Sequence, residues 1–131
     1  MDWITDNIAI GNFQDARPGY AAVDAILCLK EDCICKNRED VDAFCVPLID
    51  GSGNTKKSIE EAIDIIAGLV FSGDKILVHC HAGRSRSVCI VAAYLVRHHN
   101  MTVKEALDFV GGKRWYSLSV GIEEIFQLTS R

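Results

Sequence analysis

At residues 78–87 the chain reads Val78-His79-Cys80-His81-Ala82-Gly83-Arg84-Ser85-Arg86-Ser87. The apolar residues just before this stretch predict a buried strand, and the apolar run 88–96 after it predicts a buried helix. When a strand turns through small residues into the first turn of a helix, its backbone N–H groups converge on one point. The stretch therefore predicts a loop that binds a tetrahedral oxyanion.

Two side chains of this loop have groups that are suited to catalysis. Cys80 supplies a thiol at the start of the turn, and Arg86 supplies a guanidinium that binds oxyanions in a bidentate manner. Gly83 allows a turn that a β-branched residue would not tolerate. A Cys-x₅-Arg pair alone is weak evidence, but this one lies between a predicted strand and a predicted helix. The arrangement predicts phosphoryl transfer through a cysteine.

Predicted strands and helices alternate along the chain. We expect strands at residues 3–5, 8–11, 25–29, 44–49 and 75–79, and helices at 58–71, 87–99, 102–110 and from 119 onward, with a helical turn at 19–23 and a loop over 30–42. This order predicts a single α/β domain over residues 1–131, with a mostly parallel central sheet flanked by helices. The phosphate-binding loop would join a central strand to a buried helix, at the carboxyl end of the sheet.

Composition excludes several classes of protein. The net charge of −4 predicts no broad basic face for nucleic acid. The longest apolar stretch, 87–96, is too short to span a bilayer, so we expect no integral membrane segment. The first residues are acidic and no apolar signal region follows, which predicts a cytoplasmic protein. The oligomeric state cannot be inferred from these features.

The chain contains six cysteines. Without a secretory context, and with a core of sufficient size, we expect no structural disulfides. Three cysteines lie in apolar runs and are predicted to be small buried hydrophobes: Cys28, Cys45 and Cys89. Cys33 and Cys35 form a Cys-x-Cys pair in a charged loop, but no second pair follows at a suitable spacing, so no metal site is predicted. Which cysteine would pair with Cys80 on oxidation is not evident.

The pattern His79-Cys80-x-x-Gly83-x-x-Arg86-Ser87 resembles the signature of the cysteine-dependent protein tyrosine phosphatase superfamily. The short chain is most similar to the dual-specificity branch. The resemblance extends over nearly the whole chain and includes residues 45–50, 106–110 and 113–114. It implies a phosphatase that forms a phosphocysteine intermediate and needs no cofactor or metal.

The residues of the loop then have expected roles. Cys80 is the nucleophile, with a pKa lowered by the helix N-terminus and nearby cations. Arg86 binds two phosphoryl oxygens, and Ser87 stabilises the leaving thiolate or caps the helix. The phosphate is bound by the backbone N–H groups of His81, Ala82, Gly83, Arg84 and Ser85. The resemblance adds His79 as an orienting partner beneath the loop.

Two further side chains are candidates for the site. Asp50 ends a predicted strand and begins a glycine-rich loop, which suits a general acid; the alternative is an ordinary turn residue. Arg114 is either a second anion contact, as in relatives, or a solvated charge. The sequence departs from the family after Arg114, because Trp115 replaces a usual proline and Ser119-Val120 replaces a common Pro-Asn.

Several functions remain open. Phosphotyrosine and phosphoserine or phosphothreonine in proteins are the leading substrates. Basic residues like His81 and Arg84 also occur in relatives that act on phosphoinositides or phosphatidylglycerophosphate, so a lipid or small phosphomonoester is the alternative. A phosphate-binding pseudophosphatase would have lost Cys80, Arg86 or the acid. A rhodanese-like sulfurtransferase would not need Asp50.

Overall fold

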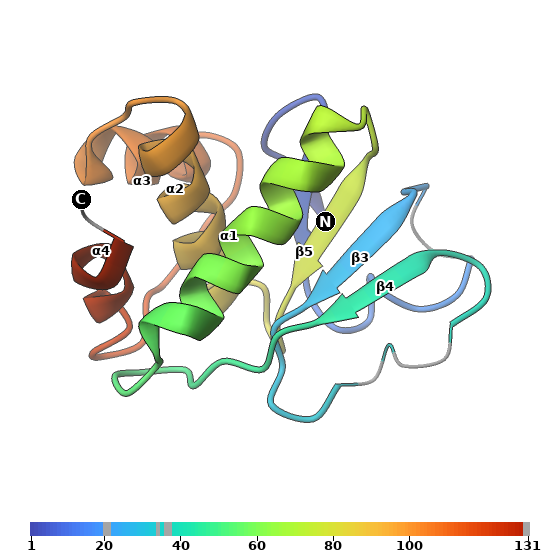
Figure 1. Ribbon diagram of the computed structural model, residues 1–131, viewed down its shortest axis with the longest axis horizontal. Helices are drawn as coiled ribbons and strands as arrows, with labels where there is room; N and C mark the ends of the chain where they lie inside the picture. Colours follow the sequence, from blue (N-terminus) through green and yellow to red (C-terminus); the bar gives the residue numbers. More distant parts are fainter. Residues whose placement is uncertain (20–21, 34, 36–37, 130–131) are drawn as a thin grey trace.

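The computed structural model describes residues 1–19, 22–33, 35 and 38–129 (Figure 1). The strands are β1 (Asp2–Trp3), β2 (Ile8–Gly11), β3 (Ala25–Cys28), β4 (Asp42–Cys45) and β5 (Ile76–His79). The helices are α1 (Lys56–Phe71), α2 (Arg86–His98), α3 (Val103–Gly111) and α4 (Glu124–Thr129). Helices packed on one mostly parallel sheet confirm the predicted α/β class.

The strands form one sheet in the order β1-β2-β5-β3-β4. The pairs β2–β5, β5–β3 and β3–β4 are parallel, and only β1 is antiparallel to its neighbour β2. β5 is the central strand and is buried along its whole length, as a strand covered on both faces must be. The chain leaves β5 at the carboxyl edge of the sheet, where parallel α/β folds place their ligand sites.

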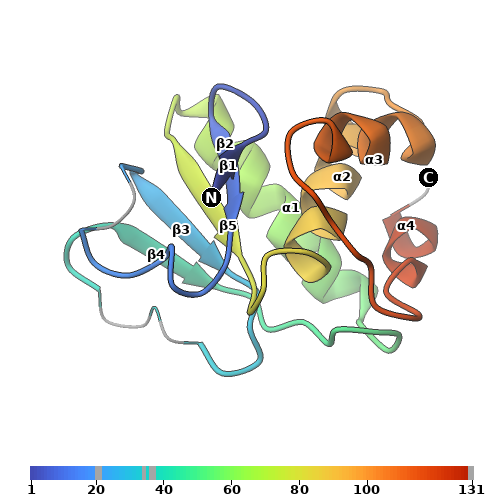
Figure 2. The same cartoon turned by 180° about the vertical axis from the view of Figure 1, so that it is seen from behind.

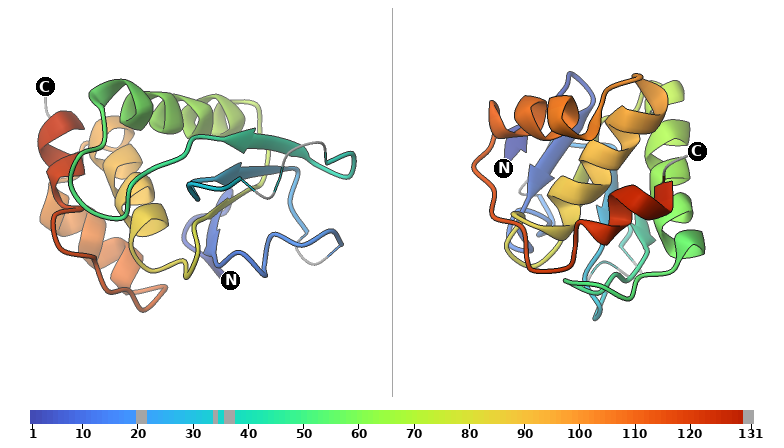
Figure 3. Two further views of the ribbon diagram at one scale, coloured as in Figure 1. Left: turned by 90° about the horizontal axis from the view of Figure 1, so that it is seen from below. Right: turned by 90° about the vertical axis from the view of Figure 1, so that its left-hand side faces the viewer.

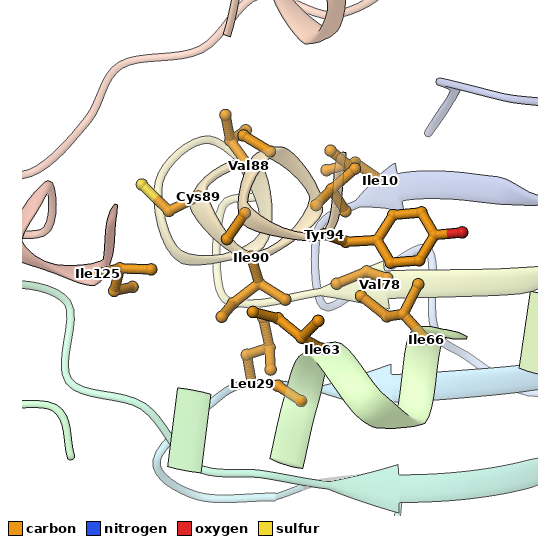
Figure 4. Close-up of a cluster of buried hydrophobic side chains, with 14 of the residues drawn as sticks. Ile10, Leu29, Ile63, Ile66, Val78, Val88, Cys89, Ile90, Tyr94 and Ile125 are labelled. Carbon is orange, nitrogen blue, oxygen red and sulfur yellow. The ribbon is translucent and has the colours of Figure 1, made fainter. Parts of the chain in front are cut away.

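Helices cover one face of the sheet (Figure 3). α1 and α2 lie directly on it, and α3 and α4 pack against α2 (Figure 1). Figure 4 shows Ile63 and Ile66 of α1, Ile90 and Tyr94 of α2, and Val78 of β5 meeting in the core. α2 is buried along most of its length, from Arg86 to Leu95. The helix that follows the phosphate loop is thus fixed within the core, and so is the start of that helix.

Loops cover the opposite face (Figure 2). The buried residues there include Ile26, Cys28 and Leu77 from the sheet, with Ala16 and Cys35 from the loops. Among the described residues no helix lies on this face, so the helices flank the sheet on one side only. The expected helical turn over 19–23 falls partly on residues 20–21, which lie outside the described part of the chain; Ala22 and Val23 are not helical.

Several boundaries differ from the predicted ones. The strand expected at 3–5 is β1 (Asp2–Trp3), and most other ends differ by one residue. Larger differences occur at β4, α1 and α4. The strand expected at 44–49 is β4 (Asp42–Cys45), which ends before Pro47 because proline has no N–H for the ladder. α1 is capped by Thr55, whose side chain accepts a hydrogen bond from the Ser58 backbone N–H, so it begins earlier than the expected start at Ser58. α4 begins at Glu124, because residues 119–124 form successive turns with Gly121 at φ +89°. Thr102 and Glu105 form a capping box at the start of α3, close to the expected helix start at 102.

The cysteines also differ from expectation. Cys33 and Cys45 form a disulfide, so the prediction of no structural disulfides was wrong. The reason is topological: Cys45 ends edge strand β4, and the loop before β4 folds back over the sheet and brings Cys33 to it. Cys28 and Cys89 are buried free thiols, as predicted, whereas Cys45 is half-buried and disulfide-bonded, so its prediction as a small buried hydrophobe was wrong. In the described part of the chain, no helix is both long enough and apolar enough to cross a membrane.

Candidate active site

The predicted phosphate loop lies between β5 and α2, at the carboxyl edge of the sheet. Cys80 follows the last residue of β5, and Arg86 is the first residue of α2. Both are buried, with exposed fractions of 2% and 8%. The structure therefore brings the thiol and the guanidinium together at the N-terminus of a buried helix, where backbone N–H groups have no intrahelical partner.

The surroundings of Cys80 favour its thiolate. The Sγ atom lies 3.3 Å from Oγ of Ser87. Burial raises the pKa of Cys80, but hydrogen bonds from the Ser87 side chain and from the backbone of Ser87 and Gly83, together with the charge of Arg86, outweigh it. The net result is a pKa below the ordinary value for cysteine. A thiolate at this position is the form that acts as a nucleophile.

The guanidinium of Arg86 has a hydrogen-bond partner at NH1 but, within the described residues, none at Nε. Its NH1 donates a hydrogen bond to the backbone oxygen of Leu48 over 3.3 Å. Its Nε is buried and has no hydrogen-bond partner among the described residues. Buried donors are normally satisfied, so an unpaired guanidinium N–H beside a lowered-pKa thiol is suited to an oxyanion ligand.

Gly83 and Arg114 fix the back of the loop. Gly83 has φ +68°, and a Cβ there would lie 2.6 Å from the carbonyl carbon of Gly11 and 2.7 Å from an Arg114 nitrogen. Arg114 donates to the backbone oxygens of Gly83 at 2.7 Å and Ile10 at 3.2 Å, and pairs with the Asp2 carboxylate at 2.9 Å. Arg114 thus supports the loop from behind through its Nε and NH1 groups, and its role as a second anion contact stays a prediction.

The departure from the family pattern after Arg114 does not remove support from the loop. The backbone N–H of Ser117 donates to the Arg84 oxygen at 3.0 Å, and that of Ser119 donates to the buried Ser85 Oγ, also at 3.0 Å. Backbone groups of this segment therefore supply polar contacts where relatives commonly have an asparagine side chain. Ala82 and Arg84 are exposed on the outer surface of the loop.

His79 lies beneath the loop, as expected from the resemblance. It is fully buried, and its Nδ1 lies 3.2 Å from the backbone oxygen of Cys80. Since a carbonyl oxygen only accepts, Nδ1 carries the hydrogen of this bond. The other ring nitrogen, Nε2, lies 3.3 Å from Sγ of Cys35.

His81 contacts two residues that the sequence did not point to. Its exposed ring stacks on Phe13 at 4.8 Å between ring centroids, and its Nδ1 lies 3.3 Å from Nζ of Lys30. Lys30 also lies over the Phe13 ring, 5.0 Å from its centroid. Phe13 and Lys30 are remote from the motif in sequence, and only the folding of the loops after β2 and β3 brings them to the site.

A hollow of about 260 Å³ adjoins the loop. It is lined by Lys30, Glu31, Asp32, His81 and Arg86. Both cationic and acidic side chains therefore surround the position where a substrate would approach Arg86.

Asp50 is exposed and lies in the loop between β4 and α1. The Leu48 carbonyl, near it in the chain, is the one bound by Arg86. Asn54 shapes the loop: its Oδ1 accepts from the Ile49 N–H at 2.7 Å, and its Nδ2 donates to the Ile49 oxygen at 2.9 Å. The segment that carries Asp50 is thus bonded both to Arg86 and within itself. The part played by Asn54 was not predicted from the sequence.

The chain is similar to known phosphatases. Residues 20–130 match the model of the dual specificity phosphatase catalytic domain. The human protein "Dual specificity protein phosphatase 22" is 33% identical over 97% of this chain and 72% of its own length. The Arabidopsis thaliana protein "Dual specificity protein phosphatase 1" is 44% identical over 47% of this chain, but that match covers only 31% of the relative.

Solved structures agree in fold. The crystal structure of human DUSP28 covers 98% of this chain, and 94% of its own length is matched, with a TM-score of 0.87 at 21% identity. The family model and the human relative place the chain in the cysteine-dependent protein tyrosine phosphatase superfamily. More particularly, the chain belongs to the dual specificity phosphatase catalytic-domain family.

Proposed function

We propose that the protein hydrolyses phosphomonoesters through a phosphocysteine intermediate, with phosphotyrosine and phosphoserine or phosphothreonine in proteins as substrates. The observation that carries this proposal is the Cys80 thiol of lowered pKa, 3.3 Å from the Ser87 hydroxyl and next to a buried guanidinium with an unpaired N–H.

In the first step, the Cys80 thiolate attacks phosphorus. The S–P bond forms as the bond from phosphorus to the leaving oxygen breaks, and Asp50 donates its proton to that oxygen. Arg86 and the loop N–H groups bind the equatorial phosphoryl oxygens, where negative charge must be stabilised during in-line transfer. Because Asp50 lies in an exposed loop, it can approach the leaving group from the solvent side.

In the second step, water attacks the phosphocysteine. The Asp50 carboxylate takes a proton from the water as the new P–O bond forms and the S–P bond breaks. The Ser87 hydroxyl donates a hydrogen bond to the departing Cys80 thiolate. The products are inorganic phosphate and the free enzyme, with Asp50 protonated for the next cycle. No metal enters either step.

The rim of the site supports a protein substrate over a lipid. The hollow beside Arg86 carries Lys30 and His81, but also the carboxylates Glu31 and Asp32. An anionic membrane surface favours an uninterrupted cluster of basic residues, which this rim does not provide. His81 and the exposed Arg84 keep a lipid or small phosphomonoester as the second candidate.

Substrate panels test this proposal. Wild-type protein should hydrolyse an aryl phosphate and phosphopeptides, and Cys80→Ser should be inactive. A strong preference for phosphoinositides or other phospholipids over phosphopeptides would reverse the order of substrates. Phosphopeptide binding without turnover would indicate a binding module, and turnover of thiosulfate a sulfurtransferase. A cytoplasmic location and action as a single domain over residues 1–131 remain predictions.

A further inference from the structure

A cluster of thiols lies on the loop-covered face of the sheet. Cys28 is the last residue of β3 and His79 the last residue of β5, and the two are direct partners across the parallel ladder. Their side chains therefore point to the same face. Cys35, from the loop that covers this face, lies against them, with its Sγ 3.3 Å from Nε2 of His79.

We propose that Cys28, Cys35 and His79 bind a zinc ion. The two Sγ atoms and a ring nitrogen of His79 all lie within 4.8 Å of one another, and all three residues are fully buried. Zinc bonds of about 2.3 Å to sulfur and about 2.0 Å to nitrogen require ligand atoms within roughly 4 Å of each other. Only a small inward shift of the side chains separates the observed arrangement from such a site.

The orientation of the histidine supports coordination. Its Nδ1–H donates to the Cys80 carbonyl over 3.2 Å, which leaves the lone pair of a neutral ring on Nε2. Metal-binding histidines usually donate their second ring N–H to a carbonyl or carboxylate in this way. Nε2 is also the atom that faces Cys35. The histidine is therefore already in the tautomer that a metal ligand needs.

The charge balance favours a divalent ion. When zinc binds, the two thiols release their protons to solvent and become thiolates. Two thiolates and a neutral imidazole balance the charge of Zn²⁺, so the buried centre is neutral and its desolvation cost is small. The three residues supply three of the four ligands that zinc usually takes.

The disulfide is not part of this site. Cys33 and Cys45 also lie near Cys28, within the same 4.8 Å limit, but they are bonded to each other. Their sulfurs are then not thiolates. The three-residue site therefore depends on Cys28, Cys35 and His79 alone, and it would anchor the covering loop to the two strands beside the phosphate loop.

Zinc content tests the proposal directly. The wild-type protein, purified and equilibrated with excess Zn²⁺ and then desalted, should retain about one zinc ion per chain by elemental analysis. Cys28→Ser and Cys35→Ser should each lower the zinc affinity more than about tenfold. The control Cys89→Ser removes a buried free thiol from α2 and should keep full zinc content.

Two further variants locate the metal. Cys80→Ser should keep its zinc; loss would place the ion on the thiol of the phosphate loop and overturn the proposal. The double variant Cys33→Ser/Cys45→Ser should also keep it, and loss there would contradict the three-residue site.

The wild-type protein gives a readout that does not depend on variant folding. Co²⁺ in place of zinc should produce the near-ultraviolet charge-transfer bands of cobalt–thiolate bonds, and added Zn²⁺ should abolish them and raise Tm. A wild-type protein that retains no zinc and gives no such bands would overturn the site.

Discussion

The Ser87 Oγ lies 3.3 Å from the Cys80 Sγ, where the loop after β5 meets the first turn of α2. This contact matters most when the sulfur carries negative charge, which occurs before attack and again when the phosphocysteine breaks down. In the second step the negative charge develops on the sulfur in the transition state, whereas the first step consumes it, so Ser87→Ala should slow the second step more than the first. We expect a burst of aryl alcohol followed by turnover about 10²-fold below wild type, the usual scale for removal of one charge-stabilising donor. Stopped-flow absorbance measures both phases; equal loss of burst and turnover would contradict this role.

The lowered pKa of Cys80 predicts the pH dependence of its reactivity. Below the folded-state pKa the sulfur is a neutral thiol, and above it the sulfur is a thiolate, so alkylation accelerates as pH rises through that value. Since the pKa is lowered, the midpoint should lie below that of free cysteine. Iodoacetamide labelling, followed by mass spectrometry of the Cys80 peptide, gives the profile. Ser87→Ala should move the midpoint upward, and a midpoint at or above that of free cysteine would be inconsistent with the site described.

Asp50 can be tested through the leaving group. An alkyl phosphate, such as phosphoserine, needs a proton on its leaving oxygen, whereas a nitrophenyl phosphate does not. Asp50→Ala should lower kcat/KM for a phosphoserine peptide at least about tenfold more than for the nitrophenyl ester. The control is Asp64→Ala, on helix α1. If Asp50→Ala slows both substrates equally, another residue is the acid.

Arg114 should contribute to stability through the loop. Its guanidinium binds the carbonyls of Gly83 and Ile10 and the carboxylate of Asp2. Arg114→Ala should lower the free energy of unfolding by about 1.5–3 kcal/mol, the range for hydrogen bonds to charged groups, and should lower kcat. Lys113→Ala, at an exposed neighbouring position, should do neither. Urea denaturation and steady-state kinetics measure the two effects. An unchanged stability would show that these contacts are not needed to hold the loop.

Short sequence patterns were sufficient to predict those elements of the fold that depend on neighbouring residues. The apolar strand before Cys80, the buried helix after Arg86 and the capping box at Thr102 follow from short-range periodicity and capping chemistry. The thiol, the guanidinium and the glycine with positive φ lie in one loop, so spacing along the chain was sufficient to find them.

Contacts between distant segments could not be predicted in this way. Cys33 meets Cys45, and Phe13 and Lys30 reach His81, only because loops fold over one face of the sheet. Arg114 has the right charge for an anion contact, but its position behind Gly83 follows from the path of the chain after α3. Cys28 and His79 are neighbours through strand pairing that joins residues far apart in sequence. Tertiary packing, not local propensity, decides such contacts.

The central claim is that the phosphoryl group is transferred from the substrate to the Cys80 sulfur before it is hydrolysed. Acid-quenched Ser87→Ala, incubated with an aryl phosphate and digested, should show one added phosphoryl group on the peptide that contains Cys80, and Cys80→Ser should show none. Multiple turnover with no phosphorylated Cys80 peptide, or turnover by the Cys80→Ser variant itself, would contradict the account.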